Sequence, residues 1–280
     1  MGVANMKNKK FGEKFVLILL ASVWAVICLF PIWVLFSVSF SSDSSNMTKT
    51  YLPNSFSNGI ENFSFAINTV DILTATWDTM LFSLIAIVGM LIICSLAAYE
   101  FAFFEFPLKK MFFGILLASM MLPMILYVIP LYRFIFGIGL ADTHLGVALP
   151  FLISPLSVFI LMQFLEDLPT EFIDSAKVDG AGHFRIFFSI ILPLLRNGLI
   201  TATVLLFLKV WGTFLWPSLV TADKIQAMSV TIANLLSPQF YVDPRVKIAS
   251  MLLALLPPLI VYIFFQKYVI RGITMSGIKG

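Results

Sequence analysis

The chain has 280 residues, of which 60% are hydrophobic and only 12% are charged, and 29 of them are phenylalanine. This composition excludes a soluble domain with a polar surface and indicates a protein of the lipid bilayer. The formal net charge of +3 arises from Lys and Arg residues scattered between apolar runs, so it gives no support to nucleic-acid binding.

Six apolar runs are long enough to cross a bilayer, which takes about 20 residues. The predicted fold is therefore all-α, a single polytopic membrane domain over residues 1–280 with six transmembrane helices. The first run could instead be a secretory signal peptide, but its apolar part exceeds the about 7–15 residues of a signal core, so we expect a retained helix. The predicted spans cover residues 15–40, 79–99, 111–132, 143–165, 197–220 and 248–266.

The distribution of Lys and Arg predicts the orientation. These residues are concentrated at both ends of the chain, at Lys109 and Lys110, and in the segment 166–196, and they are sparser in the other connecting segments. Cytoplasmic segments carry the excess of Lys and Arg. We therefore expect both termini and the segment 166–196 in the cytoplasm, and the segments 41–78 and 223–247 on the other side of the membrane.

The cytoplasmic segment 166–196 has the pattern of folded structure. Pro169 and Thr170 suit a helix start, an apolar face follows at Phe172, Ile173 and Ala176, and Gly180 suits a helix stop. Two short helices that meet at this glycine would form a compact knob. Its small side chains would allow close approach, so the knob could dock into a groove of a partner protein. The alternative is a loop that is merely amphipathic and lies on the membrane.

The second half of this segment predicts a surface helix. Phe184, Phe187, Phe188 and Ile191 recur at helical spacing before Pro193, so we expect them to form one apolar face along the membrane.

This cytoplasmic segment resembles a known family. Asp174-Ser175-Ala176, Gly180 and the run Ile190–Pro193 match the spacing of the EAA loop of binding-protein-dependent ABC importer permeases, although Asp174 replaces the usual Glu and Ser175 the usual Ala. The resemblance implies that the loop is the coupling helix that docks onto an ATPase subunit. The docking residues it implies are Glu171, Asp174, Ser175, Ala176, Asp179, Gly180 and Ala181.

A second motif is similar to that of the carbohydrate type of this family, the maltose-permease-like second subunit. The run Trp211–Pro217 resembles an aromatic motif in its fifth span, although Gly212 and Thr213 depart from the usual residues. The resemblance implies a heterodimer with a homologous second permease, two ATPase subunits and an extracytoplasmic solute-binding protein. ATP and Mg²⁺ would bind to the ATPase, since the chain has no G-x-x-x-x-G-K-[ST] loop.

Lys209 is the one charged residue inside the predicted spans. A Lys at the centre of a span is costly by about 2.5–3.5 kcal/mol, so it should face protein or water. It either snorkels or pairs with a carboxylate of the partner permease, or it lines the translocation cavity and binds a sugar hydroxyl or an anionic group. Candidate residues of the substrate pathway are Lys209, Trp211, Thr213 and Trp216, with the two indoles as stacking surfaces.

The predicted function is thus a permease for a sugar or oligosaccharide, which alternates access and catalyses no reaction. The alternatives are a permease of the same type for glycerol phosphate or an acidic saccharide, and an ion-coupled secondary transporter. An ion-coupled transporter would have acidic residues deep in its spans, whereas Asp78 and Glu100 are predicted to be the water-exposed ends of one span. For an enzyme the best candidate is His144 beside Asp142, where a helix-capping role is the simpler interpretation.

Overall fold

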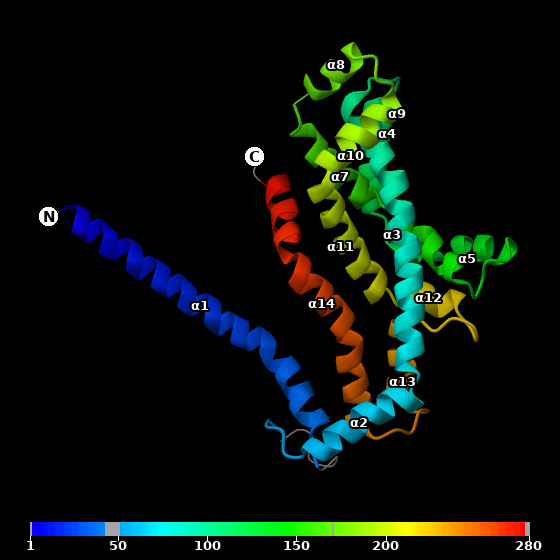
Figure 1. Ribbon diagram of the computed structural model, residues 1–280. Helices are drawn as coiled ribbons and strands as arrows, with labels where there is room; N and C mark the ends of the chain where they lie inside the picture. The colour runs from blue at the N-terminus through cyan, green and yellow to red at the C-terminus, as the bar shows by residue number, and fades with distance from the viewer. Residues whose placement is uncertain (1, 43–50, 170, 278–280) are drawn as a thin grey trace. The chain divides into compact units, whose positions relative to one another are not determined.

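The computed structural model describes residues 2–42, 51–169 and 171–277, and the side chains between residues 14 and 270 in those ranges; Thr170, the predicted helix start, lies outside them. Within these ranges all regular secondary structure is helical. The chain divides into two compact units, Met1–Ile72 with Leu235–Leu253, and Leu73–Asn234 with Ala254–Gly280 (Figure 1).

The first unit contains α1 (Gly2–Ser39), α2 (Phe56–Thr69) and the start of α14 (Pro244–Gly277). Most of the apolar stretch Lys14–Ser39 of α1 is exposed within the chain and only Ser37, Val38 and Ser39 at its end are buried, as expected of a helix whose surroundings are lipid or another subunit. The end of α1 packs on α2, where the Phe40 ring lies over Gly59 and an added Cβ would overlap it. The Asn62 amide also donates to the Ser39 carbonyl at 2.8 Å.

In the second unit α3 (Ile72–Phe103) is the longest helix, and it contributes to the buried core Phe82, Ala86, Met90, Cys94, Ala98 and Tyr99. It is followed by α4 (Lys109–Met120), a short 3-10 turn (Met124–Leu126) and α5 (Val128–Gly137). The predicted run 111–132 is therefore not one helix. Pro123 adopts an extended backbone with ψ 137°, and a proline also disfavours helical geometry at the residue before it, so α4 ends at Met120 and helix resumes only at Val128.

The predicted run 143–165 consists of two helices at an angle. α6 (His144–Ala148) continues as a 3-10 turn (Leu149–Phe151), and after a break α7 (Pro155–Glu166) begins, with a bend of 50° between the two parts. Ser154 caps the new helix by accepting from the Ser157 N–H, and a proline at the first helical position needs no hydrogen-bond partner for its nitrogen. α7 packs against both α4 and α11.

The rest of the unit runs through short helices into α11. They are α8 (Glu171–Val178), α9 (His183–Ile186), the π-helical turn η4 (Phe187–Ile191), α10 (Leu192–Leu194), α11 (Arg196–Gly212), α12 (Leu215–Val220) and α13 (Met228–Leu236). The helical stretch His183–Leu194 meets α11 at a bend of 74°.

The four residues predicted to form one apolar face in the segment 183–194 differ in their burial within the chain. Phe187 and Ile191 are buried together with Ile186, but Phe184 and Phe188 are exposed. The π-helical turn explains the difference, because its i to i+5 hydrogen bonds shift the phase of the residues that share a face.

By length and composition, three helices can cross a membrane: Lys14–Ser39, Ile72–Phe103 and Pro244–Ile270. The two bent pairs, His144–Phe151 with Pro155–Glu166 and His183–Leu194 with Arg196–Gly212, raise the number to at most five. Among the described residues, the prediction of an all-helical membrane protein is confirmed, and the candidate spans number three to five.

Candidate functional site

The segment predicted to dock a partner forms a small helical knob at the end of the second unit where α3 ends and α4 begins (Figure 1). Helix α8 buries only Ile173 and Ala176, which belong to the core of the unit. The other predicted docking residues of the helix and its end, Glu171, Asp174, Ser175, Asp179 and Gly180, are exposed, and Ala181 is half-buried. One turn of α8 thus holds the knob in place while the rest of its surface stays open.

Gly180 ends α8 in a way that requires glycine. Its φ is +78°, in the left-handed region that side chains disfavour. The Gly180 N–H donates to the Lys177 carbonyl at 3.0 Å, and the Ala181 N–H donates to the Ala176 carbonyl at 2.9 Å. These two bonds form a Schellman cap, which satisfies the last carbonyls of the helix and reverses the chain into α9.

The knob is anchored to the end of α3 through aromatic rings. The centroid of His183 lies 5.1 Å from that of Phe104, and the centroid of Phe187 lies 5.3 Å from that of Tyr99. The knob thus contacts the end of α3, and its helical stretch His183–Leu194 leads through the 74° bend into α11.

Three apolar side chains on the knob were missed as candidate docking residues. Phe172 is 50% exposed, Val178 88% and Phe184 75%. A sequence signal existed for Val178, which stands out of phase with the buried pair Ile173 and Ala176. Exposed apolar residues beside charged ones are typical of a protein interface.

The substrate-pathway candidates surround a break between α11 and α12. Helix α11 ends at Gly212, and Thr213 is extended with ψ 124°. The Thr213 hydroxyl donates to the Lys209 carbonyl at 2.6 Å, and the Ser229 hydroxyl donates to the Thr213 carbonyl at 2.7 Å. Broken helices of this kind form binding sites in membrane transporters, because their free backbone groups can bind ligand.

Lys209 lies in the last turn of α11 and is exposed. Within the described part of the chain, its ammonium forms no ion pair. A cation at this position is stabilised by the carbonyl end of the helix dipole. The group is therefore free for a ligand or for another subunit.

The two tryptophans have packing roles on either side of the break. Trp211 is buried and its indole N–H donates to the Ala254 carbonyl of α14 at 3.1 Å. Trp216 is 0% exposed and its indole N–H donates to the Val147 carbonyl of α6 at 3.1 Å. Neither ring presents an open face in this chain, so what they do here is fix the geometry of the break.

Asp78 differs from its predicted place at a water-exposed helix end. It is 6% exposed, and its carboxylate binds the His144 ring nitrogen Nε2 at 2.8 Å and accepts from the Gln226 N–H at 2.9 Å. The predicted capping role of His144 belongs to its neighbour Thr143, whose hydroxyl accepts from the Gly146 N–H. Asp78 is buried because these partners, distant in sequence, replace its water.

Asp142 organises the loop that follows α12. Its φ is +55°, and its carboxylate accepts from the backbone N–H groups of four successive residues, Ala222, Asp223, Lys224 and Ile225, at 2.9–3.2 Å. Partial burial raises the pKa of Asp142, but the four N–H donors outweigh it and bring the pKa below its ordinary value. Together with Asp78, it joins α3, α6 and the loop 222–226 into one hydrogen-bonded cluster.

The chain is similar to permeases of bacterial importers. The family model described as "Binding-protein-dependent transport system inner membrane component" matches residues 90–275. The arabinooligosaccharides transport system permease protein AraQ of Bacillus subtilis is 33% identical over 79% of this chain and 79% of its own length. The sn-glycerol-3-phosphate transport system permease protein UgpE of Brucella melitensis is 30% identical over 86% of this chain and 90% of its own length.

The same fold occurs in a solved structure. A chain in the crystal structure of a bacterial ABC transporter involved in the import of the acidic polysaccharide alginate superposes with a TM-score of 0.78. The two share 22% sequence identity, and the match covers 94% of this chain and 97% of the other.

Proposed function

Because the chain belongs to the family of binding-protein-dependent transport system inner membrane components, we propose that it is the permease through which an ATP-driven importer moves a sugar or oligosaccharide into the cell. The family itself establishes a multi-pass permease of the inner membrane that is not an ATPase, and a transport complex that includes an ATPase and a binding protein. The predicted family is thus confirmed, and the cargo is what we propose.

The exposed knob carries the part of the proposal that couples this chain to an ATPase. Its helix α8 buries only Ile173 and Ala176 and leaves acidic, small and apolar side chains open together. Glu171, Asp174, Ser175, Asp179, Gly180 and Ala181 then form the surface that enters a groove of the ATPase, and the exposed Phe172 and Val178 widen it. Ala176 contributes by allowing α8 to lie close to its own core.

The complete assembly contains two permeases, of which this chain is one, with two ATPase subunits in the cytoplasm and the solute-binding protein outside. The chain contributes six spans to it. Five of them are the three long helices and the two bent pairs. The remaining span is the run 111–132, which crosses as α4 and α5 with the break at Pro123 between them. The exposed α1 and the exposed cation at Lys209 fit a chain whose surface is completed by another subunit.

The substrate passes the break between α11 and α12. Lys209 and Thr213 supply polar groups there, while Trp211 and Trp216 hold the two helix ends in place through their indole N–H bonds. Sugars bind through many hydroxyl hydrogen bonds, and the break offers the ammonium of Lys209 as a donor.

An anionic cargo is the second candidate, favoured by Lys209 itself. Its ammonium lies in the last turn before the break and forms no ion pair within the described residues, so a carboxylate or phosphate would find a partner there. The similarity to a glycerol-3-phosphate permease agrees with this alternative.

The docking proposal is tested by placing a photo-crosslinking amino acid at Ser175 in the assembled complex. Ser175 is exposed on α8 and its hydroxyl bonds only within the helix. We expect a crosslinked product with the ATPase subunit, and none from the matched control position Lys110, which is exposed at the start of α4. Equal crosslinking from the two positions in an intact complex would contradict the docking role of α8.

A further inference from the structure

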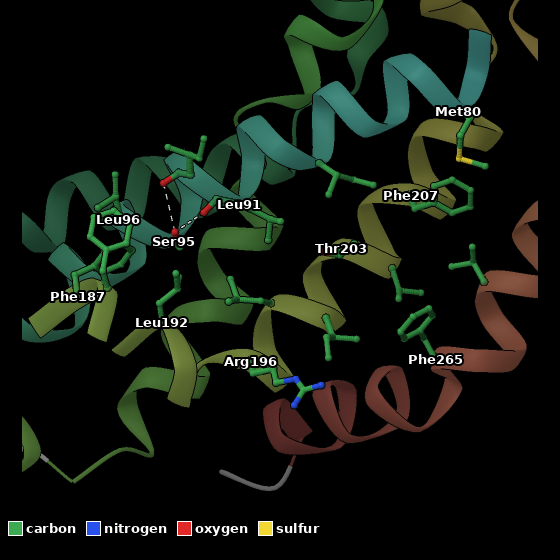
Figure 2. A pocket seen from close by; sticks show the side chains of 17 residues that line it. Met80, Leu91, Ser95, Leu96, Phe187, Leu192, Arg196, Thr203, Phe207 and Phe265 are labelled. Atoms are coloured by element: carbon green, nitrogen blue, oxygen red, sulfur yellow. Dashed lines mark hydrogen bonds between the residues drawn. The ribbon is translucent and has the colours of Figure 1, made fainter. Parts of the chain in front are cut away.

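An apolar groove runs between α3, α11 and α14 in the second unit, with a volume of about 910 Å³. Figure 2 shows its lining, in which aliphatic and aromatic side chains predominate. Arg196 is the one charged residue of this lining. Met80 and Phe207 lie at the opposite end of the groove (Figure 2).

The polar groups of the lining differ in whether they have partners. The Ser95 hydroxyl donates to the Leu91 carbonyl of its own helix (Figure 2). Arg196 is exposed, and in the part of the chain that the structure describes no carboxylate is paired with its guanidinium. A guanidinium beside an apolar groove suits a ligand that combines an anionic group with a hydrophobic part.

Along α3 the lining of the groove extends from Met80 to Leu96, about 24 Å, but its part along α11 is close to the length of one leaflet of a bilayer. Along α11 the lining extends from Arg196 to Phe207, a rise of about 16 Å at 1.5 Å per residue. Half of a hydrocarbon core is about 15 Å. Arg196 is the first residue of α11 and the last residue of the segment predicted to be cytoplasmic, so the cation lies at the level of the inner headgroups and the apolar part along α11 extends toward the bilayer midplane.

We propose that this groove is a binding site for an anionic phospholipid of the cytoplasmic leaflet. The phosphate of the lipid accepts two parallel hydrogen bonds from the Arg196 guanidinium, a geometry that arginine forms readily with phosphate. An acyl chain lies along α11 toward Phe207. Basic pockets between transmembrane helices on the cytoplasmic side are a recurring form of lipid site. Because α11 continues to the break at Thr213, the lipid contacts the same helix that carries Lys209.

The test is a photo-crosslinking amino acid at Thr203, in the groove, in the complete complex embedded in nanodiscs with equal amounts of phosphatidylglycerol and phosphatidylcholine. We expect about a fivefold preference for phosphatidylglycerol in the crosslinked product, the size of effect that one interfacial cation supplies. The same probe at Phe264, which is exposed on α14, gives the ratio in the bulk bilayer.

Matched variants decide the role of the arginine. Arg196→Gln should reduce the preference at Thr203 to the bulk ratio, Arg196→Lys should keep part of it because the charge remains without the paired hydrogen bonds, and the control Arg185→Gln, exposed outside the groove, should keep all of it. Three results would overturn the proposal: an unchanged preference in Arg196→Gln, the bulk ratio already in the parent, or a crosslink to a peptide of another subunit or of α1.

Discussion

Lys209 and the two tryptophans beside it show how single residues divide the work at the break in α11. Trp211 and Trp216 are buried and donate their indole N–H groups to α14 and α6, while Lys209 is exposed in the last helical turn. The sequence pattern predicted all three as parts of one pathway. It could not separate the packing residues from the open one, because that depends on helices far away in the chain.

Lys209→Met removes the charge and keeps most of the length of the side chain. If Lys209 lines the pathway, uptake should fall several-fold while the complex stays assembled, and the loss should be largest for an anionic cargo. Lys224→Met, at an exposed lysine of the loop after α12, serves as the control. Uptake assays with neutral and acidic saccharides check this, and unchanged uptake of both would remove Lys209 from the pathway.

Asp142→Asn should destabilise the loop 222–225 by on the order of 1 kcal/mol, because an amide NH₂ group replaces an acceptor that faces two N–H donors. The lowered pKa of Asp142 means that its contribution is complete above about pH 3.9, where the unfolded aspartate ionises, and is lost as pH falls through the folded pKa. The difference in thermal midpoint between parent and variant should therefore be constant near neutral pH and shrink in acid. A difference that grows in acid would contradict this role.

At the scale of elements, the proposed docking of the knob depends on α8 and its cap. Gly180→Val forces a β-branched residue into a φ of +78° and should weaken the cap by about 1–2 kcal/mol. We expect insertion to be normal, and both uptake and stimulation of ATP hydrolysis to fall.

Gly182→Val is the matched control for this prediction. Neither glycine has an atom within 4 Å of an added Cβ, but Gly182 has φ −71° and ψ 160°, which valine adopts freely. The two variants therefore differ in backbone strain alone. A Gly180→Val complex that couples as well as the Gly182→Val complex would show that the shape of the cap is not needed for docking.

How far the elements could be predicted depends on whether their signals are local. The helix stop was predicted from a single residue, Gly180, and α8 ends two residues before it. The break at Pro123 was visible as a proline, yet prolines also occur inside continuous helices here, as Pro31, Pro257 and Pro258 do. The buried position of Asp78 depends on His144 and Gln226, which are distant in sequence, and no local pattern could indicate it.

At the scale of the whole molecule, the orientation is open to a direct test. Single cysteines at Asn54 and Asn234, both exposed, should react with an impermeant reagent from outside the cell when Cys28 and Cys94 are replaced by alanine. The low content of Lys and Arg in both segments is the reason for this expectation. Labelling of position 234 from the cytoplasmic side only would show that the predicted number of spans is wrong.

The membrane class and the family could be predicted from the whole chain because hydropathy and the loop motif are properties of the sequence itself. The number of spans could not be predicted with the same certainty. The apolar runs 111–132, 143–165 and 197–220 read as continuous, while the structure divides each of them at a proline or at the extended residue Thr213.

The central claim is that ATP hydrolysis by a partner subunit drives import through this chain. The most direct measurement is uptake of labelled oligosaccharide and glycerol phosphate into proteoliposomes that contain the complex purified through a tag on this chain, together with its solute-binding protein. We expect uptake only when ATP is enclosed with the ATPase domains, and none with a non-hydrolysable analogue. Uptake that follows an ion gradient in the absence of ATP would contradict the claim.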